Sequence, residues 1–139
     1  MTQEQKELLL KDLCARLPYE VKVKWRTARN PAYLEVINKE KVILYRKYTF
    51  TFNWECSIED IKPYLRPLLS MTEREKEEFE HITGGKIVEG GIVQNGLCIK
   101  FATINVIEDW LNAHHFDFRG LIPMGLAIEV TEENNPYKE

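Results

Sequence analysis

In 21-VKVKWRTARNPAYLEVINKEKVILYRKYTFTFNW-54, two segments alternate apolar and polar residues, and between them two apolar-rich segments joined by the polar turn 38–40 are spaced as in a hairpin. A period of two is typical of strands that bury one face and expose the other. The segments cover residues 21–25, 32–37, 41–46 and 47–54. They predict four antiparallel strands, arranged as a meander or as a small, partly open barrel. The last strand is expected to bury Phe50, Phe52 and Trp54.

Capping boxes mark the start of two predicted helices. In this motif a Ser or Thr side chain bonds the backbone three residues later, and a Glu or Gln at that place bonds back. The chain carries the pattern at Thr2 and Gln5, and again at Thr72 and Glu75. The first box opens an N-terminal helix with leucines at helical spacing, and the second opens a helix over 73–82.

Shorter elements complete the predicted chain. Ser57 caps a helical turn, after which Pro63 and Pro67 prevent a long helix. A third helix is expected over 106–115, with Asn105 as its cap. Short strands are expected over 86–89, 97–101 and 126–130.

The length of 139 residues suffices for a single hydrophobic core. We predict one α+β domain over 1–130, with an N-terminal helix and two further helices, and a flexible tail over 131–139. No apolar run approaches the roughly 20 residues of a membrane helix, and the N-terminus lacks the features of a signal peptide. Three separate cysteines without a CxxC pair, Cys14, Cys56 and Cys98, predict free buried thiols. We therefore expect a cytoplasmic protein with no membrane partner and no cofactor.

Two adjacent histidines stand in 109-DWLNAHHFDFRGLI-122, beside aspartates, an arginine and aromatic residues. Helical spacing puts His114 on the same apolar face as Trp110, whereas His115 points about 100° away. Histidines that share a zinc ion on one helix usually stand four positions apart, as in HExxH. The spacing therefore predicts no metal site.

A helix end that docks on the core explains the same stretch without a catalytic residue. Asp117 and Arg119 are expected to hold the turn by hydrogen bonds, and Gly120 to permit the reversal of the chain. The predicted structural motif comprises Trp110, His114, Phe116, Asp117, Arg119 and Gly120. The alternative is a small enzyme that uses His114, His115 or Asp117, which a concave pocket containing these side chains would favour.

Basic residues gather in the strand-rich region. Residues 21–50 hold eight Lys and Arg against two Glu, whereas residues 73–80 hold five Glu against two basic residues. A sheet face with basic and aromatic side chains can bind single-stranded nucleic acid. The residues predicted for such binding are Lys22, Lys24, Arg26 and Lys47. We favour the simpler interpretation, in which the aromatic residues form the core and the lysines provide solubility.

Three phrases resemble, as a set, a group of short uncharacterised proteins from gut bacteria and their phages or mobile elements. They are 10-LKDLCARLPY-19, 58-IEDIKPYLRPLLSMT-72 and 109-DWLNAHHFDFRGLIPMGLAIE-129. The chain departs from the group at Glu20, where glycine is expected, and at Phe118, where tyrosine is usual. The resemblance implies a cytosolic bacterial accessory protein and no particular activity. We therefore predict a non-enzymatic binding or adaptor domain for a protein partner.

Overall fold

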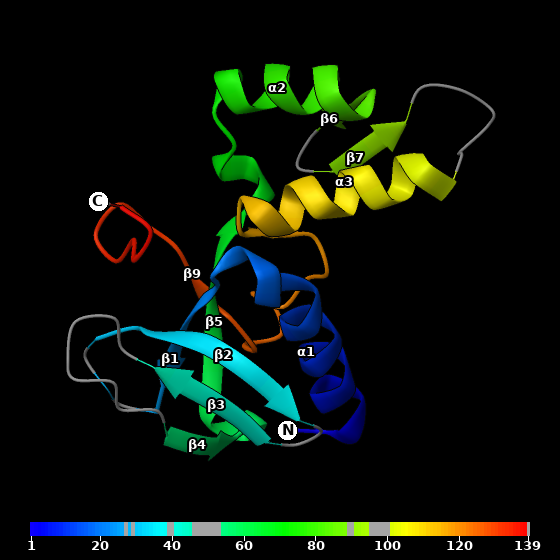
Figure 1. Ribbon diagram of the computed structural model, residues 1–139. Helices are drawn as coiled ribbons and strands as arrows, with labels where there is room; N and C mark the ends of the chain where they lie inside the picture. Colours follow the sequence, from blue (N-terminus) through cyan, green and yellow to red (C-terminus); the bar gives the residue numbers. More distant parts are fainter. Residues whose placement is uncertain are drawn as a thin grey trace.

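A twisted sheet runs through the molecule, with helices against it and at one end (Figure 1). The computed structural model describes residues 1–26, 28, 30–38, 41–45, 54–88, 91–94 and 101–138. Its main sheet contains β1 Lys22–Trp25, β2 Ala32–Asn38, β3 Lys41–Tyr45, β4 Trp54–Ser57, β5 Ile61–Pro67, β8 Phe116–Asp117 and β9 Ile128–Glu129. The strand order is β4-β3-β2-β1-β5-β8, and β9 also pairs with β5.

The first four strands form an antiparallel meander. Lys22 of β1 lies opposite Tyr33 of β2, and Lys41 of β3 lies opposite Ser57 of β4. β5 pairs antiparallel with β1 and parallel with β8 and β9. In the described residues the sheet stays open between β4 and β8. The predicted α+β class is therefore confirmed, in its meander form and not as a barrel.

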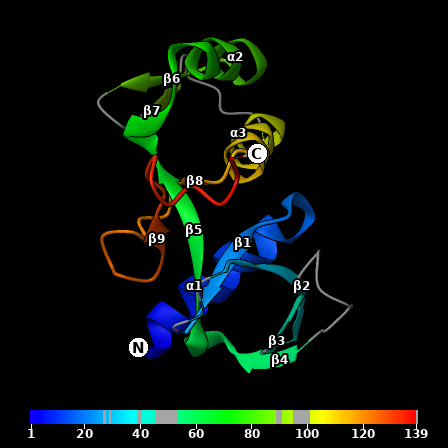
Figure 2. The same cartoon turned by 90° about the vertical axis from the view of Figure 1, so that its left-hand side faces the viewer.

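The helices are α1 (Gln3–Arg16), α2 (Glu73–Thr83) and α3 (Phe101–Ala113). Both predicted capping boxes are confirmed, because the N–H of Gln5 donates to Thr2 and the N–H of Glu75 donates to Thr72. α1 lies beside the meander, whereas α2 and α3 lie at the far end of β5 with the hairpin of β6 (Gly85–Val88) and β7 (Gly91–Gln94) (Figure 2). β5 thus connects the meander with the helical end.

The segment expected to be a proline-interrupted turn is mainly strand β5, which pairs with β1, β8 and β9. The capped turn exists over Ile58–Asp60, where Ser57 accepts a hydrogen bond from the backbone of Glu59. The chain then extends into β5 through Pro63. Proline is tolerated where a strand pairs on one side. At Pro63 the described partner is β1, and β9 joins only from Tyr64 onward.

The third helix differs from its prediction at both ends. α3 begins at Phe101, so Asn105 lies inside the helix and is not its cap. Asn costs well under 1 kcal/mol in a helix interior, which is why its presence did not mark the start. The helix ends at Ala113, and His115 has a left-handed backbone with φ of 64°. The orientation predicted for His115 on a helix is therefore wrong.

Two predicted strands fall partly outside the described residues. For 47–54 the structure describes only Trp54, the first residue of β4, so the predicted burial of Phe50 and Phe52 lies outside the description. For 97–101 it describes only Phe101, which belongs to α3. Of the strand expected over 126–130, only Ile128–Glu129 forms a strand, β9.

Two hydrophobic clusters stabilise these layers. The first packs α1 on the meander and includes Leu9, Leu13, Val23 and Leu44, all buried. The second packs α2, α3 and β8 together and consists of Met71, Phe79, Ile107, Trp110, Leu111 and Phe116. Burial of a large apolar side chain contributes about 1.5–3 kcal/mol. Trp110 and Phe116 belong to the second cluster, and Phe116 is part of β8. The stretch around the two histidines therefore lies where this cluster meets the sheet.

Candidate functional site

His114 directly follows α3 and lies against Trp110. The two rings are stacked with centroids 3.9 Å apart, and His114 Nδ1 lies 2.9 Å from the carbonyl oxygen of Trp110. His114 Nε2 lies 3.9 Å from a carboxylate oxygen of Glu78 on α2. The imidazole of His115 stacks on Tyr137 instead. The structure therefore does not bring the two histidines together around a common centre.

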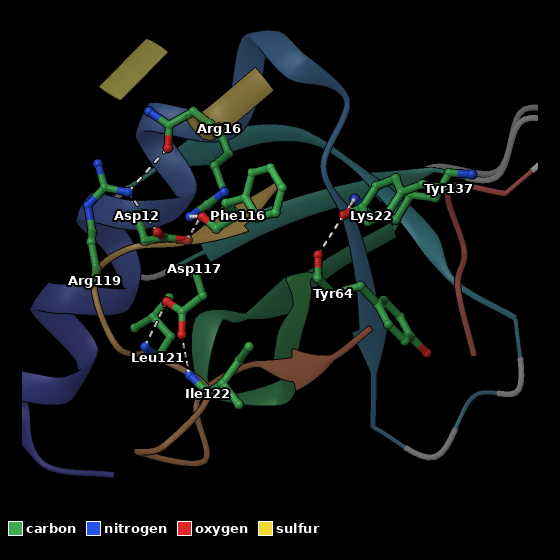
Figure 3. A network of polar contacts seen from close by, with 11 residues as sticks. Asp12, Arg16, Lys22, Tyr64, Phe116, Asp117, Arg119, Leu121, Ile122 and Tyr137 are labelled. Atoms are coloured by element: carbon green, nitrogen blue, oxygen red, sulfur yellow. Dashed lines mark hydrogen bonds and ion pairs between the residues drawn. The ribbon is translucent and has the colours of Figure 1, made fainter. Parts of the chain in front are cut away.

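Asp117 and Gly120 shape the turn that follows β8. The carboxylate of Asp117 accepts hydrogen bonds from the backbone N–H groups of Leu121 and Ile122, each 2.9 Å long (Figure 3). Gly120 has φ of 77°, a conformation that glycine adopts without strain. Both carboxylate oxygens of Asp117 are thus engaged with the backbone, which leaves this group poorly placed to accept a proton from a substrate.

A buried ion cluster that sequence reasoning missed connects α1 to the same turn. Asp12 and Arg16 are both fully buried, and Arg16 Nε donates to Asp12 Oδ2 at 2.8 Å. Arg119 Nη1 donates to the other oxygen at 2.7 Å, and Arg16 Nη2 donates to the carbonyl oxygen of Phe116 at 2.7 Å (Figure 3). One signal was present: Asp12 and Arg16 stand four positions apart on the leucine-bearing face of α1, where unpaired charges are rarely buried.

The C-terminal residues 131–138 turn back onto the sheet. The hydroxyl of Tyr137 donates to the carbonyl oxygen of Tyr64 at 2.7 Å and accepts from the backbone N–H of Lys22 at 3.1 Å (Figure 3). The ammonium group of Lys22 donates to the carbonyl oxygen of Pro136. Flexibility of this tail remains a prediction, but in the structure it partly covers Lys22, one of the predicted binding residues.

His115 occupies the junction between this tail and the ion cluster. Its ring lies parallel to that of Tyr137, with centroids 3.8 Å apart. Burial, followed by the positive charge of Arg16, lowers the pKa of His115 to about 3. The imidazole is therefore neutral at pH 7, and its protonation opposes folding.

Mild acid is therefore expected to destabilise the protein through His115. The unfolded chain takes up a proton near pH 6.5, but the folded protein does so only near pH 3. The contribution of neutral His115 is complete above pH 6.5 and decreases as the pH falls below it. At pH 5 the loss in free energy of unfolding should be about 1–2 kcal/mol, with allowance for partial exposure of the ring.

The variant His115→Asn removes this titration, and asparagine tolerates the left-handed backbone found at this position. Urea unfolding at pH 7 and pH 5 would measure the difference. The wild type should lose about 1–2 kcal/mol more than the variant between the two pH values. Equal losses would show that the pKa of His115 is the same in the folded and unfolded states.

The predicted basic residues Lys24 and Arg26 border a pocket of about 260 Å³. This β1–β5 pocket is lined by Lys24, Arg26, Glu59, Asp60, Lys62 and Ile128. Lys24 lies directly opposite Lys62 on β5, and Arg26 Nη2 lies 3.2 Å from Asp60 Oδ2. Val23 of β1 is buried, and side chains alternate along a strand, so Lys24 lies on the outward face. Lys47 lies outside the described residues.

The tryptophans of the meander belong to its inner side. Trp25 and Trp54 meet edge to face with centroids 5.5 Å apart, and both pack against the first hydrophobic cluster. On the outer side, Tyr64 is only 8% exposed, and the ammonium group of Lys22 lies over the ring of Tyr33 at 5.0 Å. The two indoles therefore lie on the opposite side of the sheet from Lys22 and Lys24 and do not stand beside the basic side chains.

The described residues contain no group of three or more His, Cys, Asp or Glu side chains that could hold a metal ion. Within the same part of the chain, no helix combines the length and apolarity required to cross a bilayer. Cys14 is free but exposed, contrary to prediction, because it lies one position past Leu13 and so turns away from the core. Cys56 is free and half-buried, and Cys98 lies outside the described residues.

Comparison with known family models, curated proteins and solved structures finds no match to this chain. Two features of the described surface therefore remain as a basis for function. One is the β1–β5 pocket with its opposed lysines, and the other is the junction of His115 with the C-terminal residues.

Proposed function

We propose that this protein is a non-catalytic binding domain that contacts a protein partner through the outward face of β1 and β5. The observation that carries the proposal is the mixed charge of the β1–β5 pocket, which presents lysines, an arginine and carboxylates around Ile128. Polar and charged groups of both signs, arranged around a small apolar contact, are typical of the surfaces by which proteins select partners.

Internal contacts weigh against the enzyme alternative. His114 is stacked on Trp110, and Asp117 is engaged by two backbone N–H groups. His115 has a low pKa and a ring covered by Tyr137. A general base needs a pKa near the working pH and a path to the substrate. The three side chains named for catalysis do not line the β1–β5 pocket, the hollow described on this surface.

The nucleic-acid alternative has weaker support than a protein partner. Lys22 is partly covered by the C-terminal residues, and Arg26 is paired with Asp60. Single-strand binding without sequence preference combines a basic groove with rings on which bases stack. On the described sheet face, Glu59 and Asp60 stand between the cations, so the positive charges do not form a continuous groove along which a phosphate backbone could lie.

The biological context belongs to the same proposal. The resemblance to short proteins of gut bacteria and their mobile elements suggests a bacterial accessory protein that acts in the cytosol. An adaptor of this kind needs one specific surface and no reaction centre. The packing of His114 on Trp110 and the hydrogen bond from the backbone of Leu121 to Asp117 agree with this.

Affinity capture tests the proposal directly. The full chain, immobilised through an added tag, would be exposed to lysate of a gut bacterium with and without nuclease. We expect a bacterial protein that binds saturably, is retained after nuclease treatment and can be reconstituted with the purified chain. Material lost on nuclease treatment would favour nucleic acid instead. Failure to retain any protein above the blank resin would contradict the proposal.

A further inference from the structure

We infer that the β1–β5 pocket binds a carboxylate-rich segment of the partner protein, with Lys24 and Lys62 as its cationic contacts. The inference rests on the proposed function and names the chemistry by which the partner is recognised. It follows from the strand register, the charges of the pocket and its size.

The strand register places two positive charges face to face. Lys24 on β1 and Lys62 on β5 are paired across the antiparallel ladder. Like charges directly opposite one another in a sheet are destabilising. Among the described residues, neither ammonium group forms an ion pair with a carboxylate. An anion bound between them would relieve this repulsion.

The carboxylates of the pocket are already neutralised from within the chain. Glu59 lies 2.8 Å from the ammonium group of Lys6 on α1. Asp60 lies 3.2 Å from the guanidinium group of Arg26. Within the described parts of the chain, Lys24 and Lys62 therefore remain without a counter-charge, and the pocket attracts anions although it contains two acids.

Size and lining favour an acidic side chain over a phosphate backbone. A volume of about 260 Å³ is just below the range typical of small-molecule pockets, so it accommodates one or two side chains. Ile128 offers apolar contact to the methylene groups of a glutamate. The side chain of Glu59 remains 49% exposed at the border. A polyphosphate chain would have to pass this carboxylate, whereas a peptide can direct one carboxylate inward.

An NMR titration with a glutamate-rich peptide tests the site, and a glutamine peptide of the same length serves as the uncharged probe. In low salt the glutamate peptide should shift the backbone amides of Lys24, Lys62 and Ile128, and the effect should weaken as salt is added. The double variant Lys24→Glu/Lys62→Glu should lower the affinity about four- to twenty-fivefold, because each of the two exposed ion pairs contributes about two- to fivefold.

A matched control changes the net charge equally at exposed positions on α1 and α2, in Lys11→Glu/Arg74→Glu. This control should bind the glutamate peptide within about twofold of the wild type. The inference is overturned if the glutamine peptide binds as well, or if the double variant binds like the wild type. It is also overturned if an oligonucleotide of equal charge binds more tightly at this site.

The inference and the proposed function fail in different ways. A partner protein captured equally by the wild type and by Lys24→Glu/Lys62→Glu would overturn the role of the pocket and leave the binding function standing. Peptide binding that depends on the two lysines, with no protein retained from lysate, would support the site and contradict the proposed function.

Discussion

Replacement of Asp12 by alanine is expected to lower the free energy of unfolding by about 3–5 kcal/mol, the usual cost of breaking a buried ion pair from one side. Both carboxylate oxygens of Asp12 are used, one by Arg16 and the other by Arg119. Arg16 is fully buried, so the variant leaves a guanidinium group without a counter-charge inside the protein. Urea unfolding followed by circular dichroism would measure the loss.

Two further variants separate charge burial from helix effects. Glu7→Ala changes an exposed acid on the same helix and should cost no more than about 0.5 kcal/mol. Asp12→Leu combined with Arg16→Met removes the charge on both sides and should cost less than Asp12→Ala alone, because no buried ion remains unpaired within the pair. A loss below about 1 kcal/mol in Asp12→Ala would show that water reaches Arg16.

The local elements of this fold could be predicted because their signals lie within a few residues. Each capping box spans four positions, and both form with the predicted partners. Segment 21–25 alternates so regularly that a strand there follows from the period alone, and the short polar turn before 41–46 indicated the hairpin that contains β3. Prediction failed where the deciding contact is distant. Proline argued against a helix in 57–72, but nothing nearby indicated that β1 would pair with this segment.

The candidate site shows the same limit. The sequence places Lys24 on an outward strand face. Its role in the candidate site depends on its pairing with Lys62, and this pairing is known only from the register of β1 with β5. Asp12 and Arg16 are visible as a pair at helical spacing, whereas Arg119 is 107 residues from Asp12 along the chain. His115 is removed from the helix by a left-handed backbone and meets Tyr137 through tertiary packing. These contacts depend on the chain as a whole.

Phe116 is the residue whose truncation should most affect the connection between the sheet and the helical end. Its side chain is fully buried, stacked on Trp110 and covered by the guanidinium group of Arg66, which lies 4.1 Å from the ring centre. Arg66 on β5 is itself held by two hydrogen bonds to Glu75 on α2, of 2.7 and 2.8 Å. The ring of Phe116 therefore packs between a strand of the sheet and α3, beside the ion pair that reaches α2.

Phe116→Ala is expected to lower the free energy of unfolding by about 3–5 kcal/mol, because it removes a buried ring and leaves a cavity beside Trp110 and Arg66. Phe116→Leu keeps most of the volume and should lose less. The exposed Leu69→Ala serves as the control and should change stability by no more than about 0.5 kcal/mol. Urea unfolding followed by circular dichroism would measure the three losses. A loss in Phe116→Ala no larger than that of the Leu69 control would mean that the helical end does not depend on this ring for its attachment to β5.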